Sequence, residues 1–177
     1  MTIIGIDPGL SGAVAIIYND RTIHLHDTPV MMTTKKGGKS KNDYLPFQMA
    51  ELLRPFCGDP YVKVFIEDVH AMPGQGSTSM FRFGYGCGLW EGIIAALALP
   101  LTKVTPQAWK KEIMQGKKDK NAARIRAQEL YPCCVSQTAR VKDDGRAEAL
   151  LIAEYGKRIS FYKSPPAAET IIRRRKR

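Results

Sequence analysis

The sequence predicts an α/β domain with a central, mixed, five-stranded sheet flanked by helices. Three apolar runs separated only by short turns open the chain, which is typical of an antiparallel meander. Later apolar runs alternate with segments of helical periodicity, which favours parallel strands joined by helices. A length of 177 residues suffices for one buried core and is too short for two sizeable lobes. We therefore expect one domain over residues 1–163, followed by a basic, disordered tail over residues 164–177.

Turn residues limit the strands of the opening meander. Residues 8–12 and the pair Asn19-Asp20 supply the two turns. They separate predicted strands at residues 2–7, 13–18 and 22–26. The third of these alternates polar and apolar residues, so we expect it to be half exposed. Residues 31–42 have no periodic apolar face, and we expect a mobile basic loop that is either simply solvated or in contact with DNA.

Helical spacing and capping residues define the rest of the domain. Predicted helices occupy residues 45–56, 77–99, 120–130 and 144–155, and another begins at residue 106. Thr105 before Pro106 is a start signal, because the threonine oxygen can cap the helix and proline fits its first position. Predicted strands at residues 61–67 and 101–104 complete the sheet, and a polar loop is expected after Pro132.

The charge balance points to a polyanionic partner. The chain has 27 Lys and Arg against 17 Asp and Glu, a net charge of +10, and its last five residues are all basic. Even without them, basic side chains outnumber acidic ones. Charge alone does not distinguish a nucleic acid from an anionic membrane surface.

Several classes of protein are disfavoured. No apolar stretch approaches the roughly 18 residues of a membrane span, so we expect no membrane partner. The chain opens on a strand rather than a secretory signal, which favours a cytoplasmic protein. Its four cysteines contain no C-x-x-C pair, so we interpret them as thiols rather than as a zinc site.

Two predicted strands end in a carboxylate with the same phase. Because side chains alternate along a strand, Asp7 lies on the opposite face to Ile4 and Ile6. Glu67 likewise ends its strand, opposite the face that carries the valines. If the two strands pair in parallel, both carboxylates emerge at one edge of the sheet, where α/β folds hold ligands.

A second pair of acids lies at the start of the last predicted helix. Asp144 and Glu148 are four residues apart and therefore share a helix face. Like charges one turn apart repel, so a cation between them would account for the pair. A solvated acidic first turn, favoured by the helix dipole, accounts for it as well.

Together the four acids predict an oxygen-only metal centre in a basic protein. Asp7, Glu67, Asp144 and Glu148 offer hard ligands suited to Mg²⁺, with Mn²⁺ able to substitute. With two ions, one would activate water and the other would stabilise the leaving oxygen of a phosphodiester. This chemistry needs no nucleophilic side chain and no small-molecule cofactor.

The four acids lie in three short motifs that follow one another along the chain. They are Ile4-Gly5-Ile6-Asp7-Pro8-Gly9, Phe65-Ile66-Glu67 and Asp144-Gly145-Arg146-Ala147-Glu148-Ala149-Leu150. Over about residues 2–157 the chain resembles RuvC-type Holliday junction resolvases of the ribonuclease H-like superfamily. The segment His-Ala-Met-Pro-Gly-Gln-Gly at residues 70–76 is similar to that of the phage, bacterial and chloroplast branch.

The resemblance implies a ribonuclease H-like fold and a homodimer that nicks two opposing strands of a four-way DNA junction. It also implies a nucleoid-associated protein of a bacterial cell or a phage-infected host. Asp7, Glu67, Asp144 and Glu148 take the catalytic and metal-binding roles. Bacterial members commonly space the last two acids three residues apart rather than four, so Asp143 stays an alternative to Asp144.

Basic segments after residue 105 are similar to those of the family. The resemblance places Lys110 and Lys120 at phosphate-contacting positions, and Lys117 and Lys118 lie in the same basic segment. Residues 110–126 carry seven basic and two acidic side chains, enough to neutralise several phosphates. An ordinary solvated helix surface is the alternative.

Two further segments are candidates for contacts with DNA or with a second subunit. Gln75 can hydrogen-bond a base edge, and Met72 can wedge between unstacked bases. Gly84, Gly88 and Gly92 recur every fourth residue and form a smooth stripe on a predicted helix. This stripe packs closely either on the protein's own sheet or on a second copy of the helix.

Two rival functions follow from the same residues. A junction-binding protein without catalysis would keep the basic surface and use the acids structurally. An actin-like ATPase is suggested by Asp7-Pro8-Gly9, but the chain has no room for a second nucleotide-clasping lobe.

Overall fold

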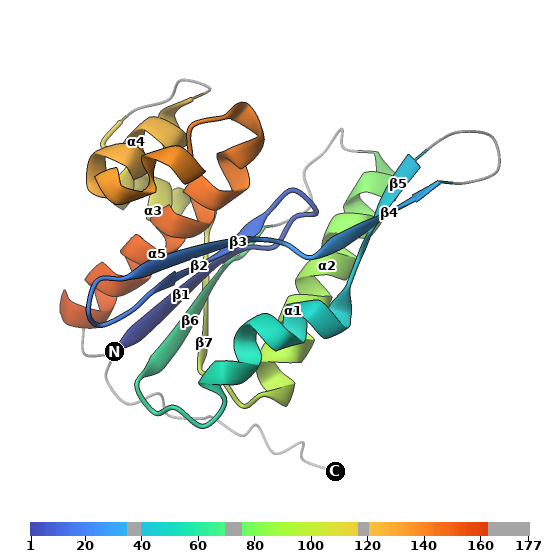
Figure 1. Cartoon of the computed structure of the whole chain (residues 1–177), viewed down its shortest axis with the longest axis horizontal. Helices are drawn as coiled ribbons and strands as arrows, with labels where there is room; N and C mark the ends of the chain where they lie inside the picture. Colours follow the sequence, from blue (N-terminus) through green and yellow to red (C-terminus); the bar gives the residue numbers. More distant parts are fainter. Residues whose placement is uncertain (35–39, 70–75, 117–120, 163–177) are drawn as a thin grey trace, which may run out of the picture.

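The structure, a computed structural model, describes residues 1–34, 40–69, 76–116 and 121–162 (Figure 1). Its main sheet has the strand order β3-β2-β1-β6-β7. The strands are β1 (Thr2–Asp7), β2 (Ala13–Ile17), β3 (Ile23–Asp27), β6 (Val62–Glu67) and β7 (Leu101–Val104). β1, β2 and β3 pair antiparallel, whereas β6 pairs parallel with both β1 and β7. The predicted mixed five-stranded sheet is confirmed.

Helices cover both faces of this sheet. They are α1 (Pro46–Leu53), α2 (Ser77–Ala96), α3 (Pro106–Ile113), α4 (Ala122–Leu130) and α5 (Asp144–Tyr162). In Figure 1, α3, α4 and α5 lie on one side of the sheet and α1 and α2 on the other. Each side has its own apolar core: Ile3 and Phe65 pack towards α5, and Ile4 and Val64 pack towards α1 and α2. The strand phases expected from the sequence are therefore correct.

The parallel pairing of β1 with β6 sets the position of the two strand-end acids. Ile6 pairs with Ile66 in register, so Asp7 and Glu67 follow at the same edge of the sheet. Both side chains lie on the α5 side, because they alternate with the residues of the opposite core.

A very close helix–sheet contact places α5 directly on β1. A Cβ atom at Gly5 would lie 2.3 Å from the carbonyl oxygen of Ala149, so no larger residue fits there. In the same way, a Cβ atom at Gly145 would lie 2.2 Å from the carbonyl oxygen of Ser11. These two contacts hold the first turns of α5 against the carboxyl end of β1, which brings their acids together.

The loop predicted for residues 31–42 is wrong where the structure describes it. β4 (Val30–Thr34) and β5 (Ser40–Tyr44) form an antiparallel hairpin beside α2 (Figure 1), and residues 35–39 lie outside the described residues. The Thr33 hydroxyl bonds to the Lys41 carbonyl and the Asp43 carboxylate, both at 3.1 Å. The hairpin is largely exposed and held by polar cross-strand contacts, so it lacks the apolar alternation by which strands are usually recognised.

One of the other local predictions is confirmed and another is not. The N-cap of α3 is confirmed, since Thr105 Oγ1 accepts a hydrogen bond from the Ala108 amide at 3.3 Å. The polar loop expected after Pro132 instead contains 3₁₀ helices at Pro132–Gln137 and Val141–Asp143. The tail of residues 164–177 lies outside the described residues. Within the described part, no helix has the length and apolar character needed to cross a membrane.

Candidate active site

Three of the four predicted acids meet at the carboxyl ends of β1 and β6. Asp7, Glu67 and Glu148 each offer a carboxylate oxygen, and these three oxygens all lie within 4.8 Å of one another. They come from β1, β6 and the second turn of α5. All three side chains are partly buried.

Neighbouring groups fix the orientation of these carboxylates. The indole Nε1 of Trp109, a fully buried residue of α3, donates to Glu67 Oε1 at 2.8 Å. The amide of Gly9 donates to Asp7 Oδ1 at 3.3 Å. Lys110 Nζ lies 3.7 Å from Glu148 Oε1 and 5.0 Å from the centre of the Trp109 ring. Among the described residues, these hydrogen bonds hold Asp7 and Glu67, and Lys110 lies beside Glu148.

Burial and mutual repulsion make the cluster reluctant to ionise fully. Burial, together with the charges of Glu148 and Glu67, raises the pKa of Asp7 to about 7. Burial also raises the pKa of Glu67, against the opposing effect of the Trp109 hydrogen bond. Such a site favours a bound cation, because the cation relieves the repulsion.

The pKa of Asp7 predicts how the stability of the metal-free protein depends on pH. An unfolded aspartate releases its proton near pH 3.9, whereas folded Asp7 keeps it to about pH 7. Between these values the folded state binds more protons, so stability falls as pH rises. Asp7→Asn removes this loss and should raise the melting temperature in EDTA by about 3–6 °C at pH 8, and by much less at pH 5.

Thermal unfolding at both pH values measures this effect. Asp20→Asn is the control, because the Thr22 amide lowers the pKa of this exposed carboxylate and the variant should not be stabilised at pH 8. An equal gain for Asp7→Asn at pH 5 and pH 8 would contradict the assignment.

The fourth predicted acid lies nearby but has another partner. Asp144 Oδ1 is 2.7 Å from Nε of Arg124, and the Asp144 side chain is half exposed. Asp143 is buried and bound by Arg140, whose backbone amide and guanidinium both donate to it. Of the two alternatives, only Asp144 borders the cleft above the cluster.

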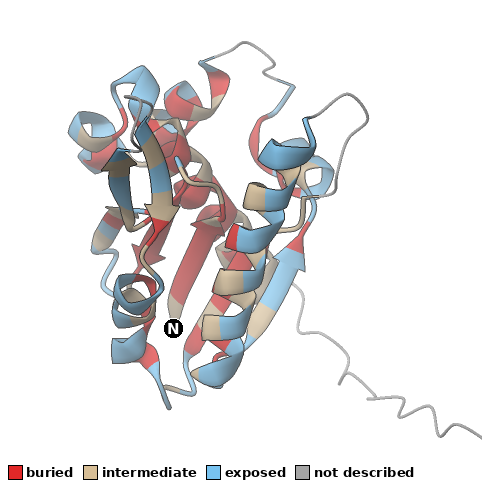
Figure 2. Cartoon of the chain, turned by 90° about the vertical axis from the view of Figure 1, so that its right-hand side faces the viewer, coloured by how far each residue is buried: buried red, intermediate tan, exposed pale blue. Residues whose placement is uncertain are grey.

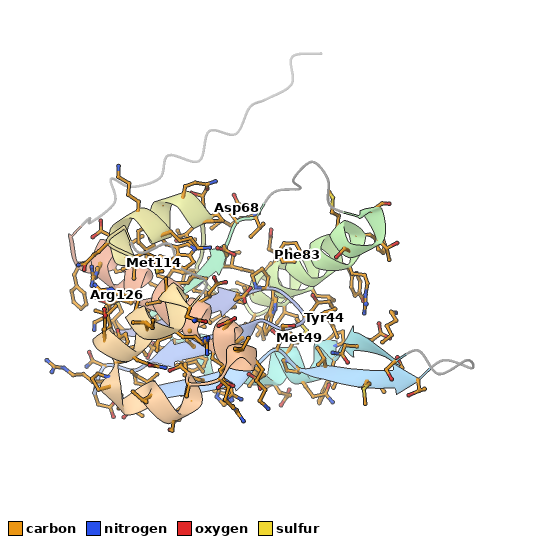
Figure 3. All side chains as sticks on the ribbon, turned by 90° about the horizontal axis from the view of Figure 1, so that it is seen from above. Tyr44, Met49, Asp68, Phe83, Met114 and Arg126 are labelled. Atoms are coloured by element: carbon orange, nitrogen blue, oxygen red, sulfur yellow. The ribbon has the colours of Figure 1, made fainter. Side chains whose placement is uncertain are left out.

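A cleft of about 970 Å³ is lined by three of the acids, Asp7, Asp144 and Glu148. One wall is formed by α2 and β5, with Tyr44, Arg82 and Phe83, and the other by α4 and α5. Figure 3 shows Tyr44 and Phe83 on the first side, with Met114 and Arg126 on the side of α3 and α4. Asp7, Glu148 and Asp144 therefore border this cleft, and Glu67 lies beside the first two.

Of the residues predicted to contact DNA, the structure describes Lys110. Lys110 lies beside the acids and is about half exposed. The others lie outside the described residues: Met72, Gln75, Lys117, Lys118 and Lys120. Arg124 and Arg126, counted above among charges for phosphate, are both 8% exposed and bonded within the protein, so they do not belong to a phosphate-binding surface.

The glycine stripe of α2 does not pack on the protein's own sheet. A Cβ atom added at Gly84, Gly88 or Gly92 meets no atom within 4 Å. Of the two alternatives for this stripe, close packing on the protein's own sheet is therefore ruled out. Figure 2 shows the outer side of α2 mostly as exposed and intermediate residues.

Sequence reasoning predicted Lys110 beside the acids but missed Trp109 and Arg124, which also contact them from outside the motifs. Trp109 was visible only as an apolar residue among lysines, and Arg124 only as one more basic residue. A buried arginine is almost always paired, but helical spacing alone does not identify the acid that Arg124 pairs with.

The residues present fit a divalent metal ion. Ligand oxygens 2.0–2.1 Å from Mg²⁺ lie up to about 4.2 Å apart, so the three carboxylates need only small rotations to share an ion. Oxygen-only ligands of high negative charge suit Mg²⁺ or Mn²⁺.

Comparisons with known proteins agree with this arrangement. No protein-family model matches the chain. Over 92 residues it is 27% identical to the chloroplastic Holliday junction resolvase MOC1 of Chlamydomonas reinhardtii; this match covers 51% of the chain but only 10% of that relative.

Solved structures of resolvases share the fold over most of the chain. Thermus thermophilus RuvC in complex with Holliday junction substrate has a TM-score of 0.59 at 13% identity, covering 92% of this chain and 96% of that one. Another structure of that RuvC has a TM-score of 0.53 at 15% identity, covering 89% and 96%. The yeast mitochondrial Holliday junction resolvase Ydc2 has a TM-score of 0.51 at 16% identity, covering 90% and 80%. The chain therefore has the ribonuclease H-like fold found in RuvC-type Holliday junction resolvases.

Proposed function

We propose that this protein is a metal-dependent DNA endonuclease that resolves four-way junctions. The observation that carries the proposal is the cluster of Asp7, Glu67 and Glu148, of which Asp7 and Glu148 line an open cleft. The fold shared with RuvC supports it, because one of the matched structures is described in complex with Holliday junction substrate.

The acids would hold Mg²⁺ or Mn²⁺, with two ions present when Asp144 also takes part. The bound metal would supply an activated water and stabilise the leaving oxygen of the phosphodiester. The chain's own task is to aim the ligands: the Trp109 indole orients Glu67, and the Gly9 amide orients Asp7. Donors placed in advance in this way reduce the reorganisation that the reaction requires.

Basic side chains at the cleft would position the nucleic acid. Lys110 lies beside Glu148 and can reach a phosphate at the border of the site. Arg82 and Lys142 line the cleft on opposite walls. Since phosphate contacts fix register without reading sequence, these residues would hold the backbone close to the acids.

We further propose a homodimer that forms through α2. This helix buries only Gly86, Trp90 and Ile94 within the chain. Its uncovered face includes Phe81 and Tyr85, which are 77% and 53% exposed, together with the open glycine stripe. Glycines let two helices approach closely, and a two-fold axis would make the face self-complementary. Two active sites related by this axis suit paired cuts in opposing strands.

A cleavage panel tests the function. Purified protein is incubated with Mg²⁺ and labelled four-way junctions, forks, flaps and plain duplex. We expect paired, symmetric nicks in the junction and little cutting of duplex. Junction binding without nicks at any metal concentration would favour the non-catalytic binder. ATP hydrolysis that is independent of DNA would favour the ATPase.

A further inference from the structure

A buried arginine holds the fourth acid of the site. Arg124 lies in α4, its side chain is 10% exposed, and its Nε is 2.7 Å from Asp144 Oδ1. Asp144 borders the same cleft as Asp7 and Glu148. The structure therefore groups three carboxylates and pairs the fourth with a cation.

Arg124 is anchored without the help of Asp144. Its Nη1 donates to the carbonyl oxygen of Ala139 at 2.9 Å, and its Nη2 donates to the side chain of Asn121. Its Nε is buried and has no aligned hydrogen-bond acceptor in the described part of the chain, despite its closeness to Asp144. Asp144 is thus held by charge, and it can leave while the guanidinium stays in place.

We propose that Arg124 is a positioning residue that competes with divalent metal for Asp144. This inference rests on the proposed metal-dependent function. By pairing with Asp144, Arg124 keeps this carboxylate out of the group formed by the other three, which limits the negative charge that they share. A metal that uses Asp144 must first outcompete the Arg124 ion pair, so this pair lowers the metal affinity of the site.

Removing the guanidinium should therefore strengthen metal binding. We expect Arg124→Gln to bind Mn²⁺ about tenfold more tightly than the wild-type protein, because the metal no longer has to break the ion pair to reach Asp144. Mn²⁺ binding is measured without DNA, by calorimetry and by electron paramagnetic resonance. The readout is thus independent of nuclease activity.

Arg126 offers a matched control on the same helix. Its side chain is also 10% exposed, but it pairs with Glu129 and donates to the Ile113 carbonyl instead. Arg126→Gln removes an equally buried positive charge and should leave Mn²⁺ affinity within about twofold. An equal gain in both variants would overturn the proposal, because any lost cation would then suffice.

A double-mutant cycle with Asp144→Asn tests whether the effect passes through Asp144. In that background, Arg124→Gln should change Mn²⁺ affinity by no more than about twofold. An undiminished gain would overturn the proposal. If Arg124→Gln does not fold, Arg124→Lys is the second variant. It keeps the positive charge but lacks the planar guanidinium, whose Nη atoms anchor the side chain. We expect it to gain less Mn²⁺ affinity than Arg124→Gln, and only when Asp144 is present.

Failure of this inference can be told apart from failure of the metal centre. Glu67→Gln should lose Mn²⁺ binding if the three-carboxylate cluster is a metal site. If the wild-type protein binds no Mn²⁺, both proposals fall. If it binds Mn²⁺ through Glu67 and neither Arg124 variant differs from it, only the role of Arg124 falls.

Discussion

Glu67→Gln should abolish DNA cleavage and leave junction binding intact. The amide keeps the volume of the side chain, and its oxygen can still accept the Trp109 hydrogen bond. It loses the negative charge that holds the metal, however. Loss of about 4 kcal/mol of transition-state stabilisation corresponds to a fall of about a thousandfold in the cleavage rate.

Single-turnover cleavage and gel-shift assays on a labelled four-way junction measure the two properties separately. Glu51→Gln is the control, because this exposed residue of α1 pairs only with Arg54 among the contacts described and should cut normally. Cleavage by Glu67→Gln within tenfold of the wild-type rate would exclude Glu67 as an essential ligand.

Gly88→Glu should convert the protein to monomers and uncouple the two cuts. A side chain at residue 88 has open space within one chain, so the variant should fold. In the proposed dimer it would place like charges opposite each other across the two-fold axis. Without a second site held at high effective concentration, the fraction of junctions cut in both strands should fall about a hundredfold.

Sedimentation analysis and nick mapping on the two strands measure these effects. Ser136→Glu adds the same charge at an exposed position of a 3₁₀ helix, away from α2, and should remain dimeric. A dimeric Gly88→Glu variant would show that α2 does not form the interface, whereas a wild-type monomer would contradict the dimer itself.

The period of two along the strands predicted where the two acids at the strand ends would lie. Alternation along β1 and β6 sets which face Asp7 and Glu67 occupy, and their parallel pairing in register brings them to one edge. The register of such a strand has little freedom, because a shift of one residue would turn its apolar face towards solvent. The same logic explains why the five-stranded sheet was predicted correctly while the polar hairpin of β4 and β5 was not.

Local periodicity in the sequence was enough to identify the candidate acids and the strand edge that carries two of them. Tertiary packing selects Glu148 rather than Asp144 as the third member of the cluster, pairs Asp144 with Arg124, and places Trp109 as a donor to Glu67. It also places the glycines of α2 on an open face. These choices depend on how closely α5 approaches β1 at Gly5 and on which buried donor meets which carboxylate, and such contacts join residues that are far apart in the chain.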